Sequence, residues 1–356
     1  MSTRPRARDL GVELGGVPGE LDAITDVAGV RVGYTTLVAG DGALVVGQGP
    51  VRTGVTAILP REDPRDPVFA GWFPLNGNGE LTGTTWIEES GFLEGPIMLT
   101  NTHSVGVVRD AVVAWQVRHG ALFQPYSYPI VGETYDGKLN DIDGQHVRGE
   151  HATAALDSAR AGQIAEGNVG GGTGMVCFGF KGGTGTASRR CGPYTVGVLV
   201  QANFGLRHQL VMGGVPVGRE LPEAAPGGPE QGSIIVVVAT DAPLLPHQLK
   251  RVARRASLGL ARTGGAAGNG SGDIMLAFST ANPGAARAEP ATRVEMLANK
   301  ELTALFEATI FATEAAILNA LVAAETMTGI DGRTAPGLPH DRVRAILACY
   351  RPRVSS

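Results

Sequence analysis

The sequence predicts a layered α+β fold in which two stacked sheets are flanked by helices. Strands and helices are both abundant, but they do not alternate in regular βαβ units, which disfavours a doubly wound parallel sheet. Several predicted strands are apolar along their whole length and therefore need cover on both faces. Two sheets that pack face to face beneath outer helices provide that cover.

The first half of the chain contains short strands, tight turns and two predicted helices. Ser104 precedes a stretch of helical apolar periodicity and stands at the expected N-cap. Asn101, Thr102 and His103 lie just before it, at a strand-to-helix turn where polar side chains commonly face a site. The predicted elements are short strands within 1–50, strands at 54–60 and 96–100, and helices at 105–117 and 146–165.

The second half has longer strands and longer helices. A helix over 246–262 has an apolar face formed by Leu249, Val252, Ala256 and Leu260. The other predicted elements are strands at 176–180, 195–204, 232–238 and 273–279, one broken or two consecutive helices within 291–328, and a short helix at 341–350.

Composition and charge exclude several classes of protein. With 43% hydrophobic and 18% charged residues and a net charge of −4, the chain has an ordinary soluble composition and no basic cluster for nucleic acid or an anionic membrane. The basic N-terminus lacks the apolar stretch of a secretory signal, and no apolar run is long enough to span a bilayer. Three sparse cysteines fit free thiols in a reducing compartment, so we expect a cytoplasmic protein.

The strand that begins at Ser233 is the strongest candidate to carry chemistry. Five β-branched residues follow this serine, which predicts a strand buried on both faces. The preceding segment, 216–232, is rich in proline and glycine and predicts an exposed, mobile loop. Cleavage of the Gly232–Ser233 bond would make Ser233 a new amino terminus, with a nucleophilic hydroxyl and a basic amine in one residue. The alternative is that Ser233 simply opens a strand.

A second polar group occupies residues 269–273 (Asn-Gly-Ser-Gly-Asp). In extended chain, Asn269, Ser271 and Asp273 share a face, and a hydroxyl beside a carboxylate can orient or relay a proton for a nucleophile elsewhere. The alternative interpretation is an ordinary polar turn.

Other chemistries have less support in the sequence. The Gly-rich turns at 170–174 and 182–186 lack a phosphate-loop pattern, so we expect backbone N–H groups there, at Gly172 for example, to approach a substrate or an oxyanion. The seven histidines include neither HExxH nor a His/Cys cluster, and no nucleophile elbow occurs, so we expect no metal and no cofactor.

Several long motifs in a consistent order resemble one family. The segments are 52–60 (RTGVTAILP), 170–175 (GGGTGM), 180–189 (FKGGTGTASR), 232–244 (GSIIVVVATDAPL), 255–260 (RASLGL) and 269–273 (NGSGD). Together they resemble the L-aminopeptidase D-Ala-esterase/amidase family, also called DmpA-type or β-peptidyl aminopeptidases. The resemblance covers roughly residues 6–330.

This resemblance implies a fold and a maturation step. Family members are similar to N-terminal-nucleophile hydrolases and form a four-layer αββα sandwich with a distinct connectivity of the DmpA/ornithine acetyltransferase type. The implied protein is a single domain, 1–356, whose precursor cuts itself between Gly232 and Ser233 into an α chain, 1–232, and a β chain, 233–356. Assembly into a homo-oligomer of αβ units, a tetramer of heterodimers, is implied as well.

The resemblance also assigns roles to site residues. Ser233 matches the nucleophile, Ser271 and Asp273 match the accessory hydroxyl and acid, and Asn203 matches the oxyanion-hole amide. In some β-peptidyl members this acid is Glu instead of Asp.

Two further matches lie in the loop after residue 132. Tyr135 matches the active-site tyrosine, and Glu133 matches the acid that receives the substrate amine in β-peptidyl members. The tryptophan that those members place a few residues after the Glu is absent from this chain, where Gly137 stands nearby.

The function implied is a self-processing serine aminopeptidase or amidase that removes N-terminal residues from small peptides, amides or esters. The alternatives are an amidase for non-peptide amides such as nylon oligomers, or an acyltransferase with the same nucleophile. The alternative from another class is a non-catalytic protein that binds a ligand with the Gly-rich turns. This alternative predicts that the chain does not cut itself.

Overall fold

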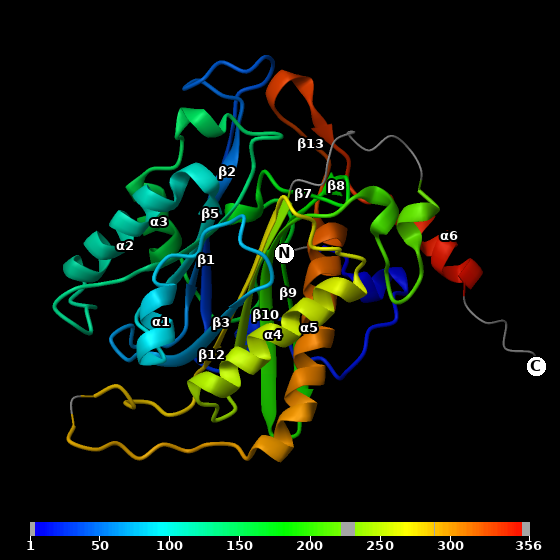
Figure 1. Cartoon of the computed structure of the whole chain (residues 1–356). Helices are drawn as coiled ribbons and strands as arrows, with labels where there is room; N and C mark the ends of the chain where they lie inside the picture. The colour runs from blue at the N-terminus through cyan, green and yellow to red at the C-terminus, as the bar shows by residue number, and fades with distance from the viewer. Residues whose placement is uncertain (1–3, 222–231, 288, 351–356) are drawn as a thin grey trace, which may run out of the picture.

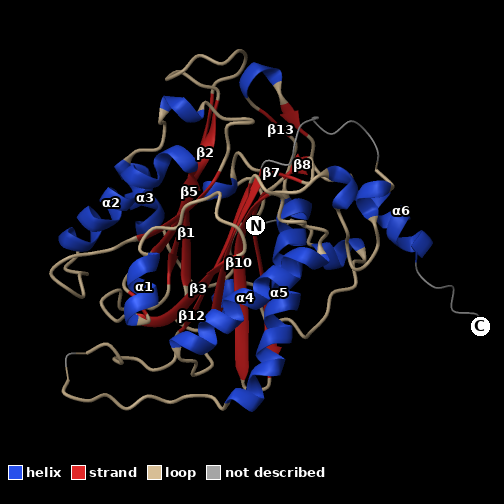
Figure 2. Cartoon of the chain, in the orientation of Figure 1, coloured by secondary structure: helices blue, strands red, loops and turns tan. Residues whose placement is uncertain are grey.

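A computed structural model describes residues 4–221, 232–287 and 289–350. Two sheets form its centre (Figures 1 and 2). One sheet has the strand order β1 (Arg31–Ala39), β2 (Val51–Leu59), β5 (Ile97–Asn101), β6 (Ile130–Thr134). The other has the order β4 (Phe92–Leu93), β3 (Val68–Pro74), β12 (Ser271–Ser279), β11 (Gly232–Thr240), β10 (Tyr194–Asn203), β9 (Gly183–Cys191). The pairs β5–β6 and β11–β12 are parallel and the other pairs are antiparallel.

Helices cover the outer face of each sheet. In Figure 1, α2 (Val105–Arg118) and α3 (Gly149–Asp157) lie against the four-stranded sheet, and α4 (Pro246–Arg262) and α5 (Leu302–Ala323) lie against the six-stranded sheet. The helices α1 (Thr84–Ser90) and α6 (His340–Tyr350) lie at the periphery. The predicted αββα sandwich is therefore confirmed.

Three apolar clusters correspond to the three interfaces between layers. One fills the space between the sheets, one lies between α4, α5 and the six-stranded sheet, and one lies between α2, α3 and the four-stranded sheet. Strand β11 contributes to two of them. Ile235 and Val237 face the other sheet, whereas Ile234, Val236 and Val238 face the helices, and all five are fully buried. The prediction of a strand covered on both faces is confirmed.

Glycines let helix backbones approach the sheets closely. A Cβ atom built on Gly33 would lie 2.1 Å from the carbonyl oxygen of Ala155 in α3, and one on Gly185 would lie 2.1 Å from the carbonyl oxygen of Ala316 in α5. Neither backbone can retreat without moving a packed helix. Part of the high glycine content of this chain thus serves helix–sheet packing.

We expect Gly185→Ala to destabilise the fold by about 3 kcal/mol, because the added methyl overpacks the α5–β9 contact. Urea unfolding followed by circular dichroism measures the loss. The matched control is Gly106→Ala on α2, where a Cβ would meet nothing within 4 Å and the backbone is helical, so stability should be unchanged or slightly raised. Equal stability of the two variants would contradict this account of the packing.

Several predicted boundaries differ from the structure. The helix expected at 146–165 spans only Gly149–Asp157, because the chain then becomes extended and Arg160 pairs with Val32 at the edge of β1. The strand expected at 176–180 is a hairpin of β7 (Val176–Cys177) and β8 (Phe180–Lys181), because Phe178 and Gly179 both have positive φ values and reverse the chain.

Two further differences concern helices. The segment expected to hold a broken helix within 291–328 contains a single long helix, α5, preceded by the short turn Asn299–Glu301. Ser104 stands at the N-cap of α2 as predicted, but its side chain makes no capping bond.

The segment Asn299–Ala323 has the length and apolar character of a membrane-spanning helix, contrary to the expectation that no run is long enough. However, 78% of its most apolar window is buried inside the protein. It therefore acts as the core helix that covers the six-stranded sheet.

Smaller elements complete the described chain. A two-stranded ribbon joins β13 (Met327–Thr328) to β14 (Thr334–Ala335). The 3₁₀ turns span Ala7–Leu10, Ile24–Asp26, Thr102–Ser104, Ile142–Gly144, Gly170–Gly172, Arg207–Gln209, Val217–Arg219, Asn299–Glu301 and Ile330–Gly332. The greater part of the loop predicted at 216–232 lies outside the described residues.

Candidate active site

A cavity of about 590 Å³ opens where the two sheets meet at the start of β11. Its walls come from four separate parts of the chain: the segment after β3, the turn before α2, the end of β6, and the β11–β12 edge. The lining residues are Gly77, Asn78, Gly79, Glu80, Thr102, Glu133, Tyr135, Gly232, Ser233 and Gly270.

Ser233 lies on the wall of this cavity. Side chains alternate along a strand, so Ser233 shares the inter-sheet face of β11 with Ile235 and Val237. Only 4% of Ser233 is exposed, which leaves its hydroxyl in a largely water-excluded position at the mouth of the sandwich. In the strand register, Ser233 pairs with Asn203 of β10 on one side and with Gly272 of β12 on the other.

Gly232 is tightly enclosed. A Cβ atom on this residue would lie 2.3 Å from the carbonyl oxygen of Asn203. A side chain therefore cannot be placed immediately before Ser233 without moving β10.

Ser271 and Asp273 form a couple behind the Gly232–Ser233 peptide. The Ser271 hydroxyl donates a hydrogen bond of 2.8 Å to Asp273 Oδ1, and both residues are 1% exposed. Ser271 pairs with Gly232 in the parallel register, whereas neither Ser271 nor Asp273 is among the described residues that line the cavity. By strand alternation their side chains point to the opposite face of the sheet from Ser233. The couple therefore lies on the face of the sheet away from the cavity, beside the backbone of residues 232–234. Asn269, expected on the same face, lies in the exposed turn before β12.

The side chain of Asn203 is held at both ends. Its Oδ1 accepts a hydrogen bond of 2.8 Å from the backbone N–H of Val176, and its Nδ2 donates one of 2.9 Å to the carbonyl of Tyr135. Because an N–H can only donate, the contact with the Val176 N–H identifies which end of the Asn203 amide is the oxygen. The NH₂ group carries two hydrogens, so it can donate to a second acceptor besides Tyr135.

Glu133 is a buried carboxylate on the cavity wall, with 4% of its surface exposed. It accepts hydrogen bonds from the Thr102 hydroxyl and, at 3.0 Å, from the backbone N–H of Glu80. Burial raises the pKa of Glu133 above its usual value; the hydrogen bonds from Thr102 and Glu80 and the nearby His103 oppose that rise, while the Glu80 carboxylate adds to it. A cation that entered the cavity would stabilise the ionised form of Glu133, which burial disfavours.

Tyr135 lines the cavity with 41% of its surface exposed. Its neighbour Asp136 is fully buried and accepts hydrogen bonds from the side-chain amides of Asn101 and Asn140. Burial raises the pKa of Asp136 to about 6. A Cβ on Gly137 would lie 2.4 Å from the Tyr135 hydroxyl, so a larger residue at 137 would have to displace this ring.

A strap of residues 76–80 joins two walls of the cavity. Asn76 Oδ1 accepts from the Asp273 N–H at 2.6 Å, and Asn78 Nδ2 donates to the Gly270 carbonyl at 2.9 Å. Glu80 then reaches Glu133 through its own backbone N–H. This strap was not predicted from the sequence. Its Asn-Gly-Asn-Gly pattern is typical of a turn, and its role depends on contacts with β12 and β6, which are distant in sequence.

Gly172 lies apart from the cavity lining. It is buried in the 3₁₀ turn Gly170–Gly172, where a Cβ would meet the Thr184 nitrogen at 2.2 Å. Its carbonyl accepts a hydrogen bond of 3.3 Å from Lys181 Nζ. The structure therefore brings together Ser233, Asn203, Glu133 and Tyr135, with Ser271 and Asp273 behind them, whereas Gly172 is not among the described residues that line the cavity.

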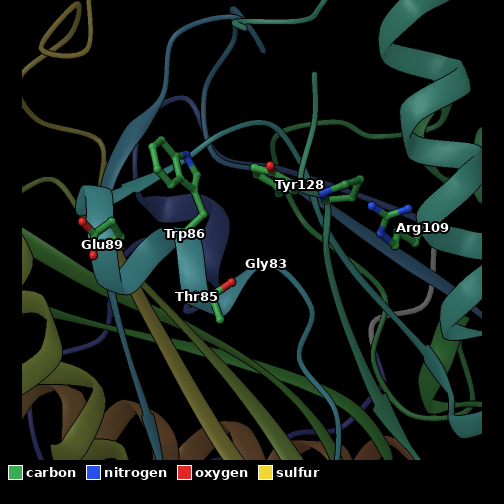
Figure 3. A pocket seen from close by; sticks show the side chains of 7 residues that line it. Gly83, Thr85, Trp86, Glu89, Arg109 and Tyr128 are labelled. Atoms are coloured by element: carbon green, nitrogen blue, oxygen red, sulfur yellow. The ribbon is translucent and has the colours of Figure 1, made fainter. Parts of the chain in front are cut away.

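A second cavity, of about 450 Å³, lies near the beginning of β6. Trp86 and Glu89 of α1, Tyr128, and Arg109 of α2 surround it (Figure 3). Its lining contains none of the predicted site residues, and its aromatic rings are 6.4 Å apart without stacking. Among the described residues, no group of three His, Cys, Asp or Glu side chains is arranged to hold a metal ion.

A serine hydroxyl on the wall of a cavity, with a hydroxyl–acid couple behind its peptide, has the residue types that nucleophilic attack on a carbonyl carbon requires. Comparison with known proteins identifies the group: the model of peptidase family S58 matches residues 22–335, and the chain belongs to this family. It is a serine aminopeptidase, a hydrolase of amide bonds, with the N-terminal-nucleophile-like sandwich that was predicted.

Similar proteins support the same classification. The β-peptidyl aminopeptidase BapA of Sphingosinicella microcystinivorans is 57% identical over 98% of this chain and 93% of its own length. A Burkholderia sp. β-aminopeptidase has 50% identity and a TM-score of 0.90 over 98% of this chain and 100% of its own. The L-aminopeptidase D-Ala-esterase/amidase of Ochrobactrum anthropi, described as a variant of the Ntn hydrolase fold, has 47% identity and a TM-score of 0.92 over 98% and 99%.

Proposed function

We propose that the chain cuts itself between Gly232 and Ser233, and that the freed Ser233 is the nucleophile of the mature aminopeptidase. The observation that supports this most directly is the position of Ser233 on the cavity wall, opposite Asn203 and one residue after the enclosed Gly232.

In the first step, Ser233 Oγ attacks the carbonyl carbon of Gly232 and the Gly232–Ser233 C–N bond breaks. The proton of the hydroxyl passes to the departing nitrogen, which leaves an ester that water hydrolyses. No α-amine exists before the cut, so a different group must assist the transfer of this proton to the departing nitrogen. The Ser271–Asp273 couple, which lies across from Gly232 in the strand register, is in a position to do so.

In the second step, Ser233 Oγ attacks the carbonyl of a substrate's N-terminal residue and the amine portion departs. The α-amine of Ser233 takes the proton, since an amine with a pKa near about 8 accepts one at neutral pH. Ser271 orients this amine. Asn203 Nδ2 stabilises the oxyanion, and water then hydrolyses the acyl-enzyme.

Glu133 would bind the ammonium of the substrate, which makes the enzyme act from the amino terminus. Burial and the contacts with Thr102 and Glu80 fix this carboxylate in place. The proposed substrates are short peptides, amides or esters with a free amino terminus. The names of the similar proteins favour β-amino acids and L-amino acids at that position.

A panel of L-, D- and β-aminoacyl p-nitroanilides tests this specificity, each paired with its N-acetyl counterpart. We expect hydrolysis of the free amines only. Hydrolysis of both members of a pair would favour an amidase for non-peptide amides. Product formation that requires an added amine acceptor would favour an acyltransferase.

The Glu133 assignment predicts a pH dependence. Since the pKa of Glu133 is raised, the carboxylate protonates at a higher pH than a free glutamate would, and KM should rise as the pH falls through that value. Glu133→Gln should raise KM about 10- to 100-fold at neutral pH, as expected for a hydrogen bond to a charged group, and should abolish this acid-side rise. Glu80→Gln is the control, because it changes a neighbouring carboxylate and keeps the backbone N–H that donates to Glu133. A Glu133→Gln profile that matches the wild type would exclude the assignment.

We also propose a cytoplasmic enzyme that assembles as a tetramer of αβ heterodimers. The three cysteines, Cys177, Cys191 and Cys349, are free thiols, which suits a reducing compartment. Light scattering of the purified enzyme measures the assembly; a monomeric αβ unit would contradict this proposal.

A further inference from the structure

Lys181 is buried and takes no part in the mechanism given above. Its side chain is fully enclosed, and Nζ donates hydrogen bonds to the carbonyls of Met175 at 2.8 Å, Gly182 at 2.8 Å and Gly172 at 3.3 Å. Three acceptors match the three N–H bonds of an ammonium group, whereas a neutral amine has only two. Burial lowers the pKa of Lys181 to about 7. Such a residue is costly to bury, which calls for an explanation.

One peptide group connects Lys181 to Asn203. The carbonyl of the Met175–Val176 peptide accepts from Lys181 Nζ, and the N–H of this peptide donates to Asn203 Oδ1 at 2.8 Å. A second donor, the Gly182 N–H, holds the same carbonyl at 2.9 Å. The plane of this peptide is thus fixed from one side by Lys181, and it fixes the orientation of the Asn203 amide on the other.

The chain of contacts also has a consistent electrostatic direction. An ammonium that donates to a carbonyl polarises the peptide, so its N–H becomes a stronger donor to Asn203 Oδ1, and the polarised Asn203 amide becomes a stronger donor through Nδ2. Hydrogen bonds linked in this way strengthen one another by about 10–30% each. Positive charge at Lys181 therefore favours negative charge on the group that accepts a hydrogen bond from Asn203 Nδ2.

We propose that Lys181 is a positioning residue for the oxyanion site, and that it acts on the reaction through the Met175–Val176 peptide and Asn203. This proposal depends on the proposed role of Asn203. It adds a residue that contacts neither substrate nor Ser233 and that nonetheless sets the donor geometry of the site.

Lys181→Met tests the proposal, because methionine keeps the length of the side chain but has no charge and no donor. We expect kcat per cleaved molecule to fall about 10- to 100-fold, less than for loss of an oxyanion donor itself because Lys181 acts indirectly, with KM changed less than about twofold. Self-cleavage, followed by intact mass, should slow in parallel. Lys181→Gln, which keeps two N–H donors, should lose less and serves if the methionine variant does not fold.

Arg207→Met is the matched control. Arg207 is a buried cation of the 3₁₀ turn Arg207–Gln209 that packs on the same β7–β8 hairpin, where its guanidinium donates to the carbonyls of Phe178 and Gly179 and covers the Phe180 ring. These contacts reach Phe178, Gly179 and Phe180, whereas Lys181 acts on Asn203 through the Met175–Val176 peptide. We expect this variant to lose stability and to keep its kcat. An equal loss of kcat in both variants would mean that Lys181 only stabilises the hairpin, and would overturn the proposal.

A double variant separates this proposal from the proposed function. Adding Lys181→Met to Asn203→Ala should cause no further loss of kcat, because Lys181 acts only through the Asn203 donor, which is already absent. Losses that multiply would overturn the proposal for Lys181 and leave Asn203 in place. An unchanged kcat in Asn203→Ala alone would instead contradict the proposed oxyanion role.

Discussion

Replacing Ser233 with alanine should leave an uncut chain with no detectable aminopeptidase activity. The variant lacks the oxygen that attacks Gly232 and the oxygen that attacks the substrate, so both events are lost by one change. Wild-type protein should separate into fragments 1–232 and 233–356 by intact-mass analysis. Because Ser233 lies at the mouth of the sandwich and not in its apolar core, Ser233→Ala should remain folded.

Two further variants make this result specific. Ser233→Cys keeps a nucleophile at the same position and should recover some self-cleavage. Ser279→Ala removes another buried serine hydroxyl, at the far end of the neighbouring strand β12, where it donates to the Ala242 carbonyl. This control should be cut normally. A Ser233→Ala protein that still splits, or still hydrolyses aminoacyl p-nitroanilides, would place the nucleophile elsewhere.

The central strand was predictable because its signal is local. A run of β-branched residues that is apolar throughout can be stable only with cover on both sides, and β11 is covered in that way. The helix α4 was predicted with its observed bounds for a similar reason, since a proline at its first position and a regular apolar face define it within 17 residues. These features need no knowledge of the rest of the chain.

The neighbours of the site could not be predicted because distant segments make them. Glu133 meets Glu80 and Thr102, which are 53 and 31 residues away in sequence, and only the pairing of the strap with β6 brings them together. The sequence predicts one strand at 176–180, whereas the structure has a hairpin there, because Phe178 adopts a positive φ that its residue type does not suggest. Lys181 precedes the Gly-rich turn at 182–186, and no local pattern there predicts a buried ammonium that donates to three carbonyls.

The sequence also does not determine which face of a sheet the alternate side chains of one strand share with those of its neighbour. Ser271 and Asp273 do share a face, as their spacing predicted. However, the β11–β12 register determines that this face is opposite to the one that carries the Ser233 side chain. A couple that seemed suited to the hydroxyl itself is therefore better placed to act on the amine of Ser233.

Asn203→Ala should lower kcat about 100- to 1,000-fold with little change in KM, because an oxyanion donor acts on the transition state more than on the bound substrate. Self-cleavage passes through a similar tetrahedral intermediate and should slow as well. Asn203→Asp tests the donor more sharply. The aspartate can still accept from the Val176 N–H, as Asn203 Oδ1 does, but it presents an oxygen where the amide presented N–H bonds.

The control for both variants is Gln201→Met. Gln201 is a buried amide two residues earlier on the same face of β10, and it donates to the Thr100 carbonyl and the Thr134 hydroxyl. Its loss should reduce stability and leave kcat nearly unchanged. If Gln201→Met lowered kcat as much as Asn203→Ala, the effect would come from disturbance of the inter-sheet polar contacts. If Asn203→Asp kept full activity, a different group would have to stabilise the oxyanion, and the shared register of Asn203 and Ser233 would have only a structural role.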